Sequence, residues 1–214
     1  MLSELTIAVA KGRMQTDAFR LLARAGVRVS EESLRSRRLA IEDESGRYRF
    51  LFVKPADVPV YVEHGVADCG VVGRDVLLES EADLLQPLDL KIGACRIAVA
   101  AREGKLTQNL GALRVATKYP RVALKHFSER GVSVEIIELS GSVELAAVLG
   151  LADCIVDVVE TGRTLAENNL EVIEEIATST GRLVVNRASY QLKAHAVAEL
   201  VNILTEAVKG ELPA

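Results

Sequence analysis

The sequence predicts an α/β protein of two similar lobes, each built on a mostly parallel sheet, with a cleft between them. Two observations support this prediction. Short apolar, β-branched runs alternate with segments whose apolar residues recur at helical spacing, as βαβ crossovers require. One seven-residue pattern also occurs twice, which indicates two halves of similar design. We expect residues 1–92 with 180–214 to form lobe I and residues 93–179 to form lobe II.

Glycine, proline and hydrophobic spacing define the expected elements of lobe I. Gly26 and Gly65 each end a helical pattern, and Pro55 suits the first turn of a helix. Asp43-Glu44-Ser45-Gly46 lies between two apolar runs and predicts a hairpin. The expected strands cover residues 5–10, 39–41, 48–53 and 69–72, and the expected helices cover residues 15–25 and 55–64.

Lobe II begins with an apolar run over residues 91–101. The polar stretch 102–111 is expected to be a surface loop, and it marks a second position for the lobe boundary. Strands and helices then alternate again. The expected strands cover residues 113–117, 132–139, 154–159, 171–178 and 182–187, and the expected helices cover 120–130, 142–149, a short segment from Thr164, and 190–208.

The repeated pattern indicates that both lobes share one design. Gly65-Val-Ala-Asp-Cys-Gly-Val71 returns as Gly150-Leu-Ala-Asp-Cys-Ile-Val156, with the same helix stop, turn and strand start. More weakly, Ala8-Val-Ala-Lys11 resembles Val115-Ala-Thr-Lys118. Two α/β halves around a cleft, as in type II periplasmic-binding-protein-like folds, account for both repeats, although short matches also arise by chance. Ligands are then expected at the carboxyl ends of the strands.

Composition excludes several classes of protein. A net charge of -4, no tryptophan and few other aromatic residues argue against a basic, stacking nucleic-acid surface. The sequence shows neither a secretory signal nor an apolar stretch of the roughly 18 residues that a membrane span needs, so we expect a cytoplasmic protein. The three cysteines match no zinc spacing and are expected to be buried. The three histidines are expected at the surface or in helix caps.

The segment from Asp157 to Leu165 has the chemistry of a ribose-phosphate site. A buried strand ends, Gly162 allows a tight turn, and hydroxyl residues open a helix whose free N–H groups attract anions. Asp157 and Glu160 can accept hydrogen bonds from ribose hydroxyls, while residues 161–164 can donate to a phosphate. In the alternative interpretation, Thr164 is an ordinary N-cap and Glu160 a solvated charge.

Other glycine and basic segments suggest further anion contacts. Lys11-Gly12-Arg13 repeats the order of strand end, glycine and helix, and Arg37 lies in a basic run whose guanidinium groups could bind pyrophosphate in bidentate fashion. Gly141-Ser142-Val143-Glu144 opens another helix and suits either capping or a polar ligand. Each of these segments could also be a solvated turn. No arrangement of side chains supports covalent catalysis.

Six motifs, in their order along nearly the whole chain, resemble the ATP phosphoribosyltransferase family. They are Ala10-Lys-Gly-Arg13, Ala56-Asp-Val-Pro59 with Glu63-His-Gly65, Gly73-Arg-Asp-Val76, Arg114-Val-Ala-Thr-Lys-Tyr-Pro120, Gly141-Ser-Val-Glu-Leu145 and Glu160-Thr-Gly-Arg-Thr-Leu165. The chain is similar to the short, catalytic form of the family, in which the long form's C-terminal regulatory domain is absent.

The resemblance implies a reaction and a set of roles. ATP adenine N1 would displace pyrophosphate from phosphoribosyl pyrophosphate (PRPP), with Mg²⁺ held on the pyrophosphate and no metal ligand from the chain. Asp157, Glu160, Thr161, Gly162, Arg163, Thr164 and Leu165 would bind PRPP, Arg13 and Arg37 would act on the departing pyrophosphate, and Lys11, Gly12, Lys54, Asp75, Gly141, Ser142 and Glu144 would bind ATP or pyrophosphate.

The resemblance also implies a homodimer and a hetero-oligomer with a regulatory subunit similar to histidyl-tRNA synthetase. Two positions depart from the family pattern, since Ala10 and Ala147 replace frequent prolines. These changes affect the stiffness of the backbone and leave the donor groups unchanged. Two alternatives remain from the residues alone. One is a non-catalytic, two-lobed protein that binds a small anion, and the other is a phosphoribosyltransferase for another base.

Overall fold

The computed structural model describes residues 5–102 and 112–210 and divides the chain into two compact units. Unit 1 contains residues 1–93 and 180–214, and unit 2 contains residues 94–179. The chain therefore passes between the units twice, after Gly93 and after Ser179. Most of the polar stretch 102–111 lies outside the described residues, and the division falls earlier in the sequence than this stretch.

Unit 1 is built on a six-stranded sheet in the order β2-β3-β1-β4-β11-β5. Its strands are β1 (Leu5–Ala10), β2 (Ala40–Glu42), β3 (Tyr48–Val53), β4 (Cys69–Gly73), β5 (Leu85–Asp89) and β11 (Gly181–Val185). The three neighbours β3, β1 and β4 are parallel, whereas β2 and β11 run antiparallel to the strands beside them. Four of the six strands therefore point the same way.

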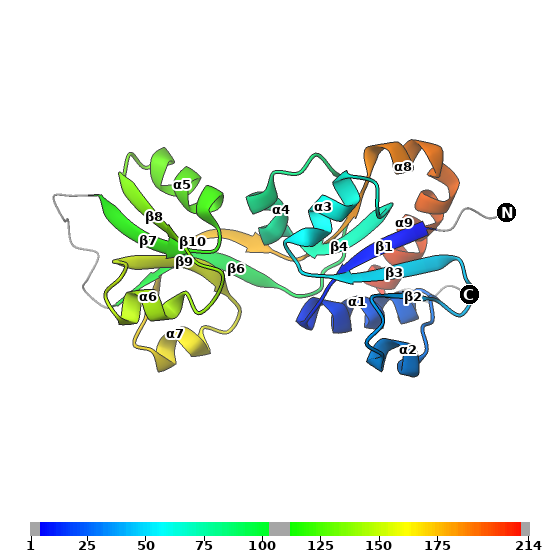
Figure 1. The fold of residues 1–214 in the computed structure, drawn as a ribbon, viewed down its shortest axis with the longest axis horizontal. Coiled ribbons are helices and arrows are strands. Elements are labelled where there is room, and N and C mark those ends of the chain that lie inside the picture. Colours follow the sequence, from blue (N-terminus) through cyan, green and yellow to red (C-terminus); the bar gives the residue numbers. More distant parts are fainter. Residues whose placement is uncertain (1–4, 103–111, 211–214) are drawn as a thin grey trace. The chain divides into compact units, whose positions relative to one another are not determined.

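Helices cover both faces of this sheet (Figure 1). The helices of unit 1 are α1 (Arg13–Arg24), α2 (Glu31–Arg35), α3 (Asp57–Glu63), α4 (Arg74–Ser80), α8 (Arg187–Leu192) and α9 (Ala194–Lys209). Apolar residues of α1 and α9 pack on one face, and those of α3 and α4 pack on the other. Each of these helices places its apolar residues against the sheet and its polar residues toward solvent.

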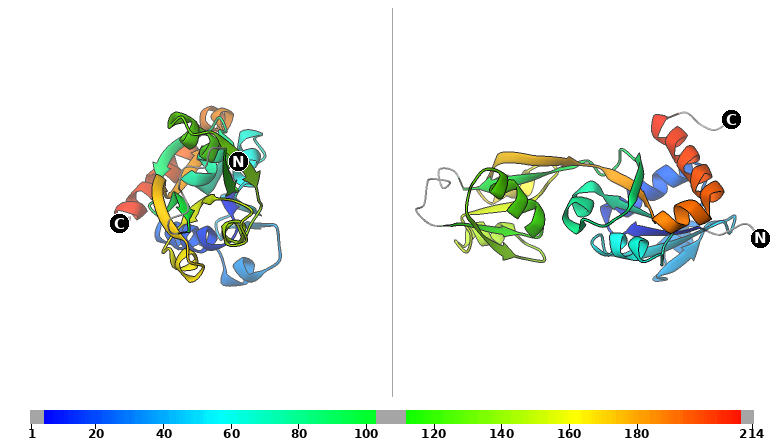
Figure 2. Two further views of the ribbon diagram at one scale, coloured as in Figure 1. Left: turned by 90° about the vertical axis from the view of Figure 1, so that its left-hand side faces the viewer. Right: turned by 90° about the horizontal axis from the view of Figure 1, so that it is seen from above.

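Unit 2 is built on a five-stranded sheet in the order β10-β6-β9-β7-β8. Its strands are β6 (Cys95–Ala101), β7 (Leu113–Thr117), β8 (Val134–Glu138), β9 (Cys154–Val159) and β10 (Glu171–Ser179), and its helices are α5 (Pro120–Glu129), α6 (Glu144–Val148) and α7 (Arg163–Glu167). α5 packs on one face of the sheet, and α6 and α7 pack on the other. β6 and β10 run side by side as an antiparallel pair (Figure 2).

The two sheets share one topology. The order β3-β1-β4-β11-β5 in unit 1 matches β8-β7-β9-β6-β10 in unit 2, with three parallel strands first and an antiparallel strand fourth in each. The repeated motif occupies equivalent places. Asp68 accepts a hydrogen bond from the Thr6 N–H at 2.9 Å, and Asp153 accepts one from the Arg114 N–H at 2.9 Å. The predicted two-lobed α/β fold is confirmed.

The weaker repeat is out of register by one residue. Ile7 pairs with Cys69 and Val115 pairs with Cys154, and Cys69 and Cys154 are the matching cysteines of the stronger repeat. The residue equivalent to Lys118 is therefore Ala10 rather than Lys11. Since strand side chains alternate between faces, this shift changes the direction of every side chain in the comparison.

Several predicted elements need correction. The predicted helix over residues 190–208 is two helices, α8 and α9, separated at Lys193. The helix expected from Pro55 begins at Asp57, since residues 54–56 form a turn in which Lys54 C=O accepts the Asp57 N–H at 2.9 Å. The elements α2, α4 and β5 were not predicted. Within the described residues, no helix is long and apolar enough to cross a membrane.

Two cysteines are buried as predicted, and one is not. Cys69 and Cys154 are fully buried, and burial raises the pKa of each thiol to about 12. Both thiols are therefore neutral and serve as small core groups. Cys95 opens β6 and is only partly buried.

Candidate active site

The candidate site of unit 2 lies where three parallel strands end. Gly141 and Ser142 follow β8, Lys118 follows β7, and Glu160 follows β9. Because β8, β7 and β9 are adjacent and parallel, their carboxyl ends share one edge of the sheet. Open α/β sheets bind ligands at this kind of edge.

The segment after β9 has a tight glycine turn. Gly162 is the N-cap of α7 and has φ 76°, in the left-handed region that glycine adopts without a steric penalty. Its carbonyl accepts the Ala166 N–H at 3.0 Å, which starts the helix. Leu165 is buried in the core of unit 2 and anchors the first turn of α7. Glu160, Thr161, Arg163 and Thr164 are exposed around this anchor.

Asp157 lies inside the end of β9 and is paired with a lysine. Its carboxylate is 3.1 Å from Lys118 Nζ and accepts the Val158 N–H at 2.7 Å. Burial raises the pKa of Asp157 above its usual range, and the positive charge of Lys118 partly opposes that shift. The carboxylate is thus held at the sheet edge at an electrostatic penalty, which is typical of functional sites.

Thr117 fixes the lysine at this edge. The fully buried Thr117 hydroxyl donates to the Val156 carbonyl at 2.6 Å and accepts the Tyr119 N–H at 2.8 Å. It therefore ties the turn after β7 to strand β9. The Lys118 ammonium also lies 5.7 Å from the centre of the Tyr119 ring. Both ends of the Lys118–Asp157 pair are consequently attached to the same pair of strands.

The turn after β8 brings another acidic group to this edge. Ser142 has φ 48°, an uncommon conformation for a residue with a side chain. Its carbonyl accepts the Leu145 N–H at 3.1 Å, and Glu144 lies in the first turn of α6. After burial, the negative charge of Glu144 contributes to the raised pKa of Asp157.

Unit 1 has an equivalent edge, at which two lysines follow the strands. Lys54 follows β3, Lys11 and Gly12 follow β1, and Asp75 lies in the first turn of α4 after β4. The Lys11 N–H donates to the Val53 carbonyl at 2.9 Å, which holds the ends of β1 and β3 together. Gly12 has φ 96° and is the N-cap of α1. Lys11 and Lys54 are exposed, whereas Asp75 is buried.

The two predicted arginines belong to this unit as well. Arg13 is the first residue of α1, and its side chain lies outside the described part of the structure. Arg37 is exposed in the segment between α2 and β2. The Phe52 N–H donates to the Leu39 carbonyl at 3.0 Å, so this segment runs beside the end of β3. Arg37 is therefore placed near the edge that bears Lys54.

The structure thus sorts the predicted residues into two groups. The edge of unit 2 has the predicted PRPP residues with Gly141, Ser142 and Glu144, and the edge of unit 1 has Lys11, Gly12, Lys54, Asp75 and the segment of Arg37. Lys118 was given no role from the sequence. Its place directly after a strand, beside Thr117, was the available signal.

One histidine was assigned wrongly. His64 is the exposed C-cap of α3 and His195 is exposed on α9, as predicted. His126 is instead buried on the inner side of α5, where its ring is 3.2 Å from a carboxylate oxygen of Glu174. Burial lowers the pKa of His126. Residues 5–102 and 112–210 contain no group of three His, Cys, Asp or Glu side chains that could hold a metal ion.

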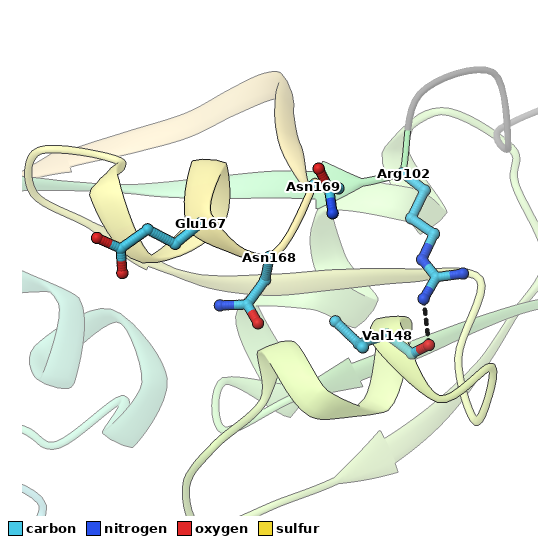
Figure 3. Close-up of a pocket in the computed structure, with 5 residues that line it drawn as sticks. All are labelled: Arg102, Val148, Glu167, Asn168 and Asn169. Atoms are coloured by element: carbon cyan, nitrogen blue, oxygen red, sulfur yellow. Dashed lines mark hydrogen bonds between the residues drawn. The ribbon is translucent and has the colours of Figure 1, made fainter.

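A cavity of about 510 Å³ lies elsewhere in unit 2. Arg102, Val148, Glu167, Asn168 and Asn169 line it, and the Arg102 guanidinium donates to the Val148 carbonyl (Figure 3). Arg102 follows the end of β6, which is antiparallel to β9. This cavity therefore lies toward the opposite edge of the sheet from Glu160, and none of the predicted site residues lines it.

Known proteins resemble this chain over nearly its whole length. The HisG family, described as ATP phosphoribosyltransferase, matches residues 54–206. A relative from Geobacillus sp. (strain WCH70), named ATP phosphoribosyltransferase, is 52% identical over 95% of this chain and 98% of its own length. One of the same name from Halalkalibacterium halodurans is 47% identical over 98% of this chain and 99% of its own length.

A solved structure has the same fold. The ATP phosphoribosyl transferase (HisG:HisZ) complex from Thermotoga maritima contains a chain that matches with a TM-score of 0.84 at 39% identity. The match covers 96% of this chain and 99% of that one.

Proposed function

The chain belongs to the ATP phosphoribosyltransferase family, and from that membership we propose how its two sheet edges divide the reaction. The enzyme transfers the phosphoribosyl group of PRPP to N1 of the ATP adenine and releases pyrophosphate, in the first step of histidine biosynthesis. The alternative of a non-catalytic anion-binding protein is not favoured. The observation that supports the division is the shared edge formed by the ends of β8, β7 and β9.

The edge of unit 2 binds the ribose and its 5′-phosphate. Asp157 and Glu160 accept hydrogen bonds from the ribose hydroxyls, and the N–H groups and hydroxyls of residues 161–165 surround the phosphate. The left-handed Gly162 supports this role because it lets the backbone turn directly into α7. Gly141, Ser142 and Glu144 lie near the adenine. The positive charge of Lys118 favours the ionised form of Asp157, which accepts the ribose hydroxyls.

The edge of unit 1 stabilises the departing pyrophosphate. Negative charge grows on this group as its bond to ribose C1 breaks, while the ribose gains oxocarbenium character. Cationic donors that are held in place stabilise such charge most effectively. Lys11, Arg13, Lys54 and Arg37 serve this purpose, and Gly12 allows the backbone to approach the phosphates. Asp75, buried at the start of α4, contributes to binding of ATP or pyrophosphate at this edge.

We propose that Mg²⁺ would bind together with PRPP, through the oxygens of its pyrophosphate. When bound, Mg²⁺ neutralises charge on the leaving group.

The enzyme acts in the cytoplasm as a hetero-oligomer. The similar Thermotoga maritima structure is a HisG:HisZ complex, and we propose that this chain likewise forms a dimer and joins a HisZ-type regulatory subunit, as the short form of its family. That subunit would resemble histidyl-tRNA synthetase.

Product formation tests these proposals together. The purified chain is mixed with ATP, PRPP and Mg²⁺, and phosphoribosyl-ATP is followed by ultraviolet absorbance and mass, with and without the regulatory subunit. We expect product, more of it with the partner, and none when Mg²⁺ is chelated. Product that is unaffected by the partner would contradict the hetero-oligomer. PRPP binding without product in either mixture would contradict the assignment of the acceptor.

A further inference from the structure

Two segments connect the units, one around Gly93 and one around Ser179. Beside unit 1 these two connections differ in length. Asp89 of β5 pairs with Arg182 of β11, and Cys95 of β6 pairs with Ser179 of β10. Between these pairs, residues 90–94 on one connection stand opposite only residues 180 and 181 on the other. The longer connection must therefore deviate from an extended strand over residues 90–94.

Left-handed residues take up the extra length. Lys91 has φ 56° and Gly93 has φ 57°. Asp89 holds this shape, since its carboxylate accepts the Lys91 N–H at 3.0 Å and the Thr180 hydroxyl at 2.7 Å. The Gly181 N–H donates to the Ile92 carbonyl at 2.8 Å, which joins the two connections directly. These hydrogen bonds hold the two connections together in one defined conformation.

Met14 of α1 packs on both connections. A Cβ added to Gly93 would lie 2.8 Å from Met14 Cε, and a Cβ added to Gly181 would lie 3.0 Å from Met14 Sδ. Because both residues are glycines, the Met14 thioether can occupy the space where their side chains would otherwise lie. Met14 also contacts the core clusters on both faces of the unit 1 sheet. It directly follows Lys11-Gly12-Arg13, the turn assigned above to the pyrophosphate.

We propose that Met14 is a positioning residue, which fixes the Lys11–Arg13 turn against the two connections at Gly93 and Gly181. The inference rests on the proposed function of that turn. Through this contact, the turn and the connections adopt one arrangement together, and this arrangement holds the cationic groups of the turn in the position that binds pyrophosphate. Met14 touches no substrate, so its loss should affect catalysis rather than the PRPP loop of unit 2.

The test compares three variants for kcat, for KM with PRPP and for Tm. Met14→Ala removes the contact, and Met14→Leu keeps a heavy atom near the position of Sδ. Ile203→Ala on α9 removes the same number of heavy atoms from a partly buried side chain of the same core cluster. We expect kcat of Met14→Ala to fall about tenfold below that of Ile203→Ala, because small misplacements of reacting groups have effects of that order or larger. KM for PRPP should change less than about threefold, and Met14→Leu should recover most of kcat.

Equal kcat in Met14→Ala and Ile203→Ala would overturn the inference, and so would a loss confined to KM. Pyrophosphate binding, measured by calorimetry on the wild-type chain and on Lys11→Met, tests the role of the turn separately. Unchanged pyrophosphate affinity in Lys11→Met would contradict the proposed function of the turn, whatever Met14 does.

Discussion

One ion pair, between the buried Asp157 and the exposed Lys118, shows how the site residues are held. Asp157 stands at the end of a core strand with a carboxylate that burial disfavours, and Lys118 of the neighbouring strand end compensates it at 3.1 Å. Stability and function therefore oppose each other at this residue, since an apolar or neutral side chain would suit the core better.

Asp157→Asn separates these two effects. The raised pKa means that the folded chain resists ionisation, so the charge lowers stability once the pH exceeds the ordinary value of 3.8. We expect the variant to have a higher Tm than the parent at pH 7, with the difference shrinking as the pH falls toward 3.8. Loss of the charged acceptor should lower kcat/KM for PRPP roughly 10- to 100-fold. Melting and steady-state kinetics measure both, and a lower Tm at pH 7 would contradict the electrostatic argument.

Arg37→Ala tests the charge on the leaving group. Removal of one such donor should weaken transition-state stabilisation by about 2.7 to 4 kcal/mol, or roughly 10²- to 10³-fold in turnover. Arg20→Ala is the matched control, because Arg20 is an exposed arginine of α1 paired with Asp17. A turnover number of Arg37→Ala within about threefold of the parent would refute the role.

The sequence could place most candidate residues because they follow strands and precede helices, and this order is visible in the hydrophobic pattern. It could not assign Lys118. Its partner Asp157 lies on another strand, and the pairing depends on the register between β7 and β9. The misaligned repeat between Lys11 and Lys118 had the same cause, because a one-residue shift cannot be seen in short apolar runs.

At the scale of elements, the turn into α7 depends on one backbone conformation. Gly162 has φ 76°, and an added Cβ would meet only Val159 Cγ1 at 3.9 Å. A substitution there is therefore limited by backbone strain rather than by space. Gly131 after α5 has φ 69°, and an added Cβ would meet no atom within 4 Å. A substitution at Gly131 would therefore cause the same backbone strain outside the segment from Asp157 to Leu165.

Gly162→Ala and Gly131→Ala should each lower the free energy of unfolding by about 1 to 2 kcal/mol. Only Gly162→Ala should raise KM for PRPP, on the order of tenfold, because about 1.4 kcal/mol of strain would then be relieved by distorting the binding loop. Chemical denaturation and kinetics distinguish the two. Equal KM values in both variants would show that the turn does not bind PRPP.

Elements that are apolar runs bounded by turn residues were predictable, and elements without that pattern were not. β1, β7 and β9 were placed to the residue because each is an apolar run bounded by turn residues. β5 was missed because Pro87 interrupts it, and proline argues against a strand in the interior of a sheet, whereas β5 is an edge strand. α2 and α4 are too short to show a helical period. The break between α8 and α9 carries no glycine or proline signal.

At the scale of the whole molecule, the two connections share one carboxylate. Burial alone would raise the pKa of Asp89. Hydrogen bonds from Lys91 and Thr180 and the charge of Arg182 outweigh this effect and lower the pKa to about 2. A depressed pKa contributes stability above the ordinary value of 3.8, and this stability is lost as the pH falls through about 2.

Asp89→Asn should therefore lower the free energy of unfolding by about 1 to 2 kcal/mol at pH 7. The difference from the parent should shrink as the pH falls from 3.8 and vanish only below about pH 2, where Asp89 is protonated in the folded chain as well. Denaturant titrations at several pH values measure it. A difference that does not depend on pH would mean that the loss comes from packing rather than from the ionised carboxylate.

The place of β11 in the unit 1 sheet determines when each half can be finished during synthesis. Unit 2 is one continuous stretch and is complete once residue 179 has left the ribosome. The unit 1 sheet still lacks β11, which pairs with both β4 and β5, so the last strand made fills an interior position. The part of the chain made first is therefore the part completed last, and until then β4 offers an unpaired edge to other nascent chains.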